Sequence, residues 1–208
     1  MKIEVWSDVV CPFCYIGKRR MEKALQHFKN IPVEIIWKSY QLDPSIKPTP
    51  GESVNEMLAK KKGWSSEQAA EANEYVTSMA SEEGLIYHLD KAIVANTLNA
   101  HQLIHLAAKH NLQGEMKERL LQAYFTEAKD INHIDTLTQL GTEVGLNKEE
   151  IRNTFKENKF VNEVQQDIEE GQMLGLRGVP FFVIDRKYGI SGAQPVEAFV
   201  QTFEKAIQ

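Results

Sequence analysis

The sequence has few cysteines, no long apolar run and no excess of positive charge. It has 2 cysteines among 208 residues, so at most one disulfide can form within the chain. No apolar run approaches the roughly 20 residues that a membrane-spanning helix needs. Lys and Arg number 24 against 29 Asp and Glu, which gives a net charge of -5, and no basic stripe is present. We therefore expect neither a membrane nor a nucleic acid as a partner.

We also expect the chain to lack an apolar leader. Residues Met1–Asp8 enter a strand pattern at once, which predicts a cytoplasmic protein. Long-lived structural disulfides are rare in that compartment. The two cysteines are therefore predicted to be redox-active or metal-binding rather than a structural cross-link.

Both cysteines lie in one motif, Cys11-Pro12-Phe13-Cys14, which follows the apolar N-terminal run. Pro12 fits the first turn of a helix, because it needs no N–H partner there. Side chains one helical turn apart stand about 5 to 6 Å from each other, a separation that a disulfide tolerates. Backbone N–H groups and the helix dipole would stabilise a thiolate on Cys11. We expect Cys11 to be the exposed nucleophile with a lowered pKa, and Cys14 the less exposed resolving thiol.

Charged residues flank the motif on both sides. Lys18, Arg19 and Arg20 follow it by one to two helical turns. They either lower the thiol pKa values further or form an ordinary solvated helix face. Asp8 would raise the thiol pKa values if it lay close to Cys11. Otherwise it is interpreted as a turn residue.

Apolar periodicity predicts β-α-β at the N-terminal end and β-β-α at the C-terminal end. Together these segments form one four-stranded sheet with flanking helices. The expected elements are a strand Ile3–Trp6, a helix from Pro12 through Phe28, strands Val33–Tyr40, Val179–Asp185 and Tyr188–Ser191, and a final helix from Val196.

The middle of the chain reads as helical. The connector Gln41–Ser53 holds Pro44, Pro48 and Pro50, and capping boxes begin at Ser53 and Ser65. Apolar stripes at helical spacing follow as far as Ile168. The predicted fold class is α/β, with the sheet domain formed by residues 1–45 and 171–208 and interrupted by an all-helical insertion at residues 46–170.

The segments SDVVCPFCYIGK and GVPFFVIDRKYGISGAQ resemble DsbA-like thiol-disulfide oxidoreductases, specifically their cytosolic FrnE-like branch. The resemblance implies a thioredoxin-like fold and an enzyme that cycles between dithiol and disulfide through a mixed disulfide. Its partners would be disulfide- or thiol-containing proteins, peptides or small molecules. No tightly bound cofactor and no metal are implied, and glutathione as a redox partner, rather than a cofactor, stays open.

The same resemblance implies substrate-binding residues. Pro180 would be a cis-proline packed against the thiols, and the backbone of Val179 would pair with the substrate chain. From the residues alone, Pro180 equally fits a trans proline that starts an edge strand. Pro12 and Phe13 are expected to meet the substrate, and His101, in the family-like stretch NTLNAH, to line a pocket between insert and sheet.

Two other readings stay open. The fold also occurs in kappa-class glutathione transferases and 2-hydroxychromene-2-carboxylate isomerases, which carry serine at the Cys11 position. They typically also have an acidic residue and an arginine where Gln194 and Pro195 stand. In that reading Ser191, Gly192 and Ala193 would hold a glutathione carboxylate. The second reading is a zinc site formed by the two cysteines with His101 and His105. The sequence does not separate oxidase, reductase and isomerase, nor does it give the oligomeric state.

Overall fold

The computed structural model describes residues 1–49 and 51–208, so Pro50 of the predicted connector lies outside the described residues. Strands and helices follow in the predicted order from one end of the chain to the other. They are β1 (Lys2–Ser7), α1 (Pro12–Leu25), the 3₁₀ turn η1 (Gln26–Phe28), β2 (Glu34–Ser39), α2 (Val54–Lys62), α3 (Ser66–Glu82), α4 (Leu98–Lys109), α5 (Gln113–Phe125), α6 (Ile134–Glu143), α7 (Lys148–Glu157), α8 (Val161–Met173), β3 (Phe181–Ile184), β4 (Tyr188–Ser191) and α9 (Val196–Ala206).

The strands form one mixed sheet in the order β2-β1-β3-β4. β1 runs parallel to β2 and antiparallel to β3, which in turn pairs antiparallel with β4. The predicted four-stranded sheet is confirmed, although its strand boundaries differ from the expected ones. In particular, Val179 and Pro180 precede β3 instead of belonging to it.

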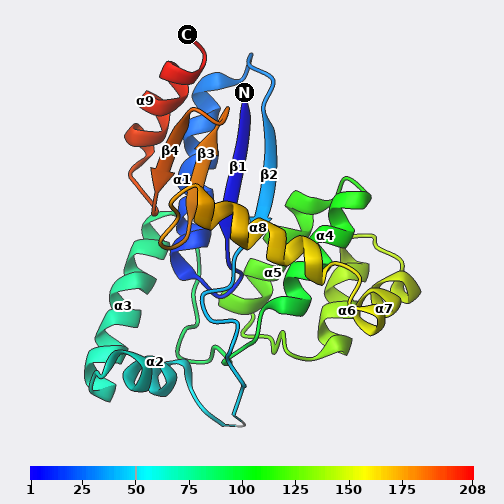
Figure 1. Ribbon diagram of the computed structural model, residues 1–208. Coiled ribbons are helices and arrows are strands. Elements are labelled where there is room, and N and C mark those ends of the chain that lie inside the picture. Colours follow the sequence, from blue (N-terminus) through cyan, green and yellow to red (C-terminus); the bar gives the residue numbers. More distant parts are fainter. Residues whose placement is uncertain (50) are drawn as a thin grey trace.

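Side chains alternate across the sheet and give it two apolar faces. Ile3 and Val5 of β1 join the main core, which also holds Phe199 and Phe203 of α9. Trp6 faces the opposite side, where its indole N–H donates to the Asp167 carbonyl of α8 at 2.6 Å. Helices α1 and α9 therefore cover one face, and α8 crosses the other (Figure 1).

The predicted helix-start signals are present in the segment between β2 and β3. Ser53 and Ser65 both form complete capping boxes, with Glu56 and Gln68 as their partners. Helices α2 to α7 extend beyond one end of the sheet (Figure 1). The main core continues from the sheet into α4 and α5 without a break. Within the described residues, no helix combines the length and apolar character that crossing a membrane requires.

A carboxylate of the insert ties α5 to α1. Glu118 of α5 accepts a hydrogen bond from the Tyr15 hydroxyl at 2.6 Å and pairs with Lys18 at 2.6 Å and with Arg19. Burial acts to raise the pKa of Glu118, but the hydrogen bonds from Arg19, Lys18 and Tyr15 outweigh it and lower that pKa to about 2. The ionised form thus holds the insert against the first helix.

This contact predicts an acid-dependent loss of stability. An unfolded glutamate titrates at about pH 4.3. The contribution of Glu118 to stability is therefore complete above that pH and disappears as the pH falls towards 2. The variant Glu118→Gln should lower the free energy of unfolding by about 1–3 kcal/mol at neutral pH. The difference from wild type should vanish in strong acid.

Denaturant unfolding across pH measures this difference. Glu204→Gln is the matched control, because Glu204 is exposed on α9 and has no ion pair in the described part of the chain. It should stay within about 0.5 kcal/mol of wild type. A pH-independent effect of Glu118→Gln would contradict the assignment.

Candidate functional site

The two cysteines lie at the junction between β1 and α1. Cys11 is the N-cap residue, with φ -88° and ψ 111°, and Pro12 opens the helix. The Cys14 N–H donates to the Cys11 carbonyl at 3.0 Å, which closes the first turn. Both are free thiols, and each sulfur lies close enough to shift the pKa of the other. The pair is therefore close enough to exchange between dithiol and disulfide.

The segment before β3 meets this turn. The Val179-Pro180 peptide bond is cis, and Cys11 Sγ lies 3.5 Å from the Val179 carbonyl oxygen. Gly17 of α1 allows the approach, because a Cβ there would stand 2.9 Å from Pro180 Cγ and 3.2 Å from Phe182 Cζ. The structure thus brings together three of the predicted site residues, Cys11, Val179 and Pro180, from opposite ends of the chain.

The expected exposure of Cys11 is wrong. Cys11 is 3% exposed and Cys14 1%. Pro12 is half-buried, and its carbonyl accepts a hydrogen bond from the Tyr87 hydroxyl at 2.8 Å. Phe13, at 38%, is the open residue of the motif. Tyr87 and the Val179 segment flank the turn and leave little of the sulfur uncovered.

The expected order of the thiol pKa values is also wrong. The hydrogen bond with Cys14 and burial raise the pKa of Cys11 well above its ordinary value. Burial acts on Cys14 in the same direction, but the hydrogen bond from Cys11, the charge of Lys117 and the Ser7 hydroxyl outweigh it and lower the pKa of Cys14. The pair can hold one anion, and the charge of Lys117 favours that anion on Cys14.

The basic residues of α1 are engaged elsewhere. Lys18 and Arg19 pair with Glu118 and Glu22, and the Arg20 guanidinium pairs with Glu83 at 2.6 Å. They form neither the solvated face nor the thiol-directed cluster that the sequence left open. Instead, they join α1 to α3 and α5.

Asp8 is a structural anion buried beneath the motif. Its Oδ1 accepts from the Val9 N–H at 2.8 Å and its Oδ2 from the Leu42 N–H at 2.8 Å. His101 Nε2 lies 3.2 Å from Oδ1. Burial acts to raise the pKa of Asp8, but the contacts with His101 and Leu42 lower it overall. Burial lowers the pKa of His101. With 1% exposure His101 has no surface to offer a substrate, which corrects the expected pocket-wall role.

The residues of the zinc reading do not converge. His105 Nε2 faces Asp167 Oδ2 at 3.2 Å and Ser39 Oγ at 3.1 Å, whereas His101 faces Asp8. Across residues 1–49 and 51–208, no three His, Cys, Asp or Glu side chains are grouped as metal ligands.

The turn after β4 is internally bonded. The Gly192 N–H donates to the Pro180 carbonyl at 2.8 Å, and Gln194 Nε2 donates to the Ser191 carbonyl at 2.9 Å. The Ala193 carbonyl accepts from Arg20 at 2.7 Å. These contacts match a strand-to-helix turn, and they already use the Gly192 N–H that the glutathione reading assigned to a carboxylate.

Three residues of the site escaped the sequence reading: Ser7, Tyr87 and Lys117. Lys117 had a detectable signal, because it stands four and eight residues before Leu121 and Phe125 on the buried face of α5. A lysine in that register is unusual, because lysine is almost never fully buried. Ser7 and Tyr87 carry no such signal, since only the fold brings them to the cysteines.

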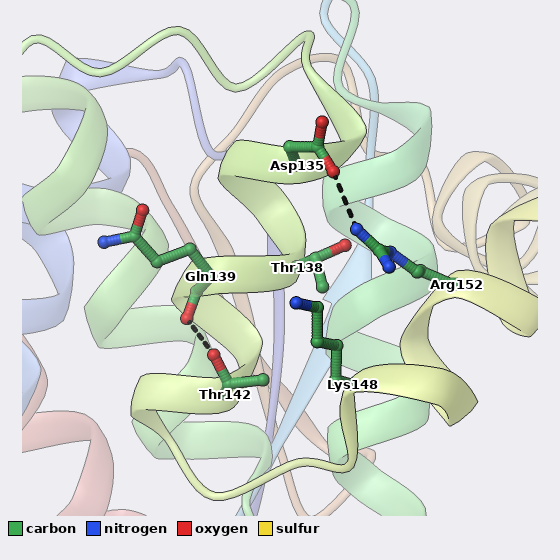
Figure 2. Close-up of a pocket in the computed structure, with 6 residues that line it drawn as sticks. All are labelled: Asp135, Thr138, Gln139, Thr142, Lys148 and Arg152. Atoms are coloured by element: carbon green, nitrogen blue, oxygen red, sulfur yellow. Dashed lines mark hydrogen bonds and ion pairs between the residues drawn. The ribbon is translucent and has the colours of Figure 1, made fainter.

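Two cavities in the described part of the chain are lined by residues other than the cysteines. One is lined by residues of α6 and α7, including Asp135 and Arg152, which pair at 3.1 Å (Figure 2). Another lies between α1 and α5 and is lined by Tyr15, Arg19 and Glu118. Neither includes Cys11 or Cys14.

Comparisons with known proteins agree with this geometry. Residues 2–204 match the DSBA-like thioredoxin domain. The chain belongs to that family. It is 37% identical to a probable DsbA oxidoreductase from Streptomyces coelicolor, covering 100% of this chain and 90% of the other at a TM-score of 0.94. It is also 30% identical to the uncharacterized protein YwbO of Bacillus subtilis, covering 99% of this chain and 94% of that protein. The cytosolic disulfide reductase DsbM of Pseudomonas aeruginosa shares the fold at 14% identity and a TM-score of 0.70, covering 100% of this chain and 98% of the other.

The contact at Gly17 is directly testable. Gly17→Ala should destabilise the protein by about 1–3 kcal/mol, because the added methyl meets the Pro180 ring and Phe182. It should also change the alkylation rate of Cys11 by displacing the Val179 segment. Denaturant unfolding and thiol alkylation measure the two effects.

Gly114→Ala provides the comparison within another helix. Gly114 is exposed in α5, and a Cβ added there would have no heavy atom of another element within 4 Å. Alanine at this position should stabilise the protein by about 0.5–1 kcal/mol and leave the thiols unaffected. Equal stability effects at the two glycines would refute the close approach.

Proposed function

We propose that this DsbA-family protein is a thiol-disulfide oxidoreductase that cycles its Cys11-Pro12-Phe13-Cys14 motif between dithiol and disulfide. The observation that carries the proposal is the meeting of the thiol pair with the Val179-Pro180 segment, with Cys11 Sγ 3.5 Å from the Val179 carbonyl. Cys11 is the nucleophile and Cys14 the resolving thiol. Cys11 stands at the helix N-cap beside the docking segment, and Cys14 lies one turn inside.

The chemistry runs through a mixed disulfide. Cys11 passes its proton to Cys14, and the Cys11 thiolate attacks a substrate disulfide. One substrate sulfur leaves as thiolate while the other stays bonded to Cys11. Cys14 then attacks Cys11 Sγ, closes the protein disulfide and releases the second substrate thiolate. The substrate is reduced and the protein oxidised; the reverse sequence oxidises a substrate dithiol.

Substrate docking is proposed at Val179, Pro180, Pro12 and Phe13. The N–H of half-buried Val179 makes no backbone hydrogen bond within the described residues, so it is free to pair with an extended chain. Phe13 adds exposed apolar surface beside it. A substrate that pairs with Val179 is brought directly to Cys11 and must shift these neighbours to reach the sulfur.

We further propose a cytoplasmic, FrnE-like protein with glutathione as a redox partner. Supporting examples that share the fold are DsbM, described as a cytosolic disulfide reductase, and the same protein solved with glutathione at 15% identity and a TM-score of 0.69. A 2-hydroxychromene-2-carboxylate isomerase also shares the fold, at 15% identity and a TM-score of 0.70. The dithiol and the occupied Ser191–Gln194 turn favour redox chemistry over isomerisation.

Trapping the intermediate tests the proposed roles. Cys14→Ser, mixed with glutathione disulfide, should accumulate a mixed disulfide on Cys11, because no thiol remains to resolve it. Cys11→Ser should form an adduct on Cys14 at least about tenfold more slowly, since Cys14 is 1% exposed and lies behind Cys11. Mass spectrometry after acid quenching measures both.

The wild type supplies the reference in the same experiment. It should release its adduct as the Cys11–Cys14 disulfide closes. The proposal fails if Cys11→Ser retains wild-type exchange, or if Cys14→Ser forms no adduct on Cys11.

A further inference from the structure

A buried lysine lies behind the thiol pair without a carboxylate partner. Lys117 of α5 is 1% exposed, and its Nζ donates to the Ser7 carbonyl at 3.4 Å and lies 5.6 Å from the Trp37 ring. Lys18 and Lys38, the other lysines deeply embedded near the sheet, both pair with carboxylates within 3.0 Å. No carboxylate oxygen in the described part of the chain lies within 4.0 Å of Lys117. A buried ammonium without a counter-ion is costly, so an unpaired lysine at this place needs an explanation.

Of the negative charges that act on Lys117, that of a Cys14 thiolate has the largest effect. The groups that act electrostatically on Lys117 are Cys14, Asp8 and Cys11, which favour its charged form, with Lys18 opposing. His101 of α4 also faces this cluster. Burial is the largest influence and lowers the pKa of Lys117 to about 8. At neutral pH the amine can therefore both carry and lose a proton.

A second buried polar group points to the same sulfur. The Ser7 hydroxyl has no hydrogen-bond partner in the described residues, although it is fully buried. It lies beside Cys14 and favours the anionic form of that thiol. A hydroxyl left without an acceptor in the dithiol state gains one when Cys14 ionises.

The other titratable groups of the cluster, Asp8 and His101, already have hydrogen-bond partners. Asp8 is ionised and already accepts hydrogen bonds from two backbone N–H groups, so it is not the acceptor of a thiol proton. His101 turns its Nε2 towards Asp8. Lys117 is the group that remains.

We propose that Lys117, supplied by the helical insert, is the counter-ion of the Cys14 thiolate and accepts the Cys14 proton during resolution of the mixed disulfide. This inference rests on the proposed function. In the mixed disulfide Cys14 is a thiol, so Lys117 first releases its own proton to solvent; the Cys14 proton then passes to the neutral amine, and the Cys14 thiolate attacks Cys11 Sγ. The bond between Cys11 and the substrate sulfur breaks, and the substrate leaves as a thiolate that takes a proton from water. When the neutral disulfide closes, the Cys14 thiolate is consumed, and Lys117 returns its proton to solvent.

Rapid mixing of the reduced protein with glutathione disulfide separates the two steps. Acid quenching and mass spectrometry follow the formation and decay of the Cys11 adduct at several pH values. Lys117→Met should slow adduct decay at neutral pH at least about tenfold, and should slow decay more than it slows adduct formation. The pH midpoint of decay should move upward by about one pH unit, since burial then acts on Cys14 without an opposing charge.

Ser7→Ala keeps the lysine and removes the hydroxyl. It should slow the same step by about three- to tenfold and move the midpoint in the same direction. This small substitution keeps the proposal testable if Lys117→Met does not fold. Lys18→Met is the matched control, because Lys18 is a buried lysine whose partners are Glu22 and Glu118. It should leave adduct decay within about threefold of wild type.

Equilibration with glutathione gives an independent readout. Loss of the counter-ion destabilises the reduced form, so Lys117→Met should shift the equilibrium towards the protein disulfide by about tenfold, or about 30 mV. The inference is overturned if folded Lys117→Met, or Ser7→Ala in its place, keeps the wild-type decay rate and pH midpoint. Failure of the wild type to form any Cys11 adduct would instead overturn the proposed function.

Discussion

The start of α1 rests against the segment that precedes β3, and the rest of the site depends on that contact. Gly17 has no side chain where Pro180 and Phe182 approach, so the helix can come close enough for Cys11 Sγ to reach the Val179 carbonyl. The antiparallel pairing of β1 with β3 also helps to fix the distance between Cys11, which follows β1, and Val179, which precedes β3. A residue near position 11 and a residue near position 180 become neighbours because one sheet joins both ends of the chain.

Burial of charge is the second constraint. Two sulfurs, one carboxylate and one amine are enclosed beneath the motif with little water, so each charge there needs a partner. Asp8 finds backbone N–H groups and His101. Lys117 finds only a carbonyl and an aromatic ring within the described residues. The asymmetry places the single anion of the dithiol on Cys14, although the helix N-terminus alone would have favoured Cys11.

The sequence predicts the sheet and the motif because both depend on local patterns. The strand at Ile3, proline at the first turn of the helix and the capping boxes at Ser53 and Ser65 are recognisable within a few residues of chain. The order of the thiol pKa values depends instead on Lys117, which is separated from Cys14 by most of the insert. The same holds for Tyr87, whose hydroxyl meets Pro12 across 75 positions of chain. Nothing near either cysteine indicates these contacts, so a local reading assigned the helix dipole an effect that long-range neighbours reverse.

Helix α5 therefore reaches the thiols at the sheet, and one residue shows how this helix is held in register. β2 is an edge strand, with main-chain groups that need covering. Gln113, the first residue of α5, covers them as a strand would: the Trp37 N–H donates to its Oε1 at 3.0 Å, and its Nε2 donates to the Trp37 carbonyl at 2.9 Å. Lys117 stands four residues later, one helical turn deeper on the same face. The amide clamp on the sheet edge thus fixes the depth at which the amine enters the core, and that depth brings it to the Ser7 carbonyl beneath the motif.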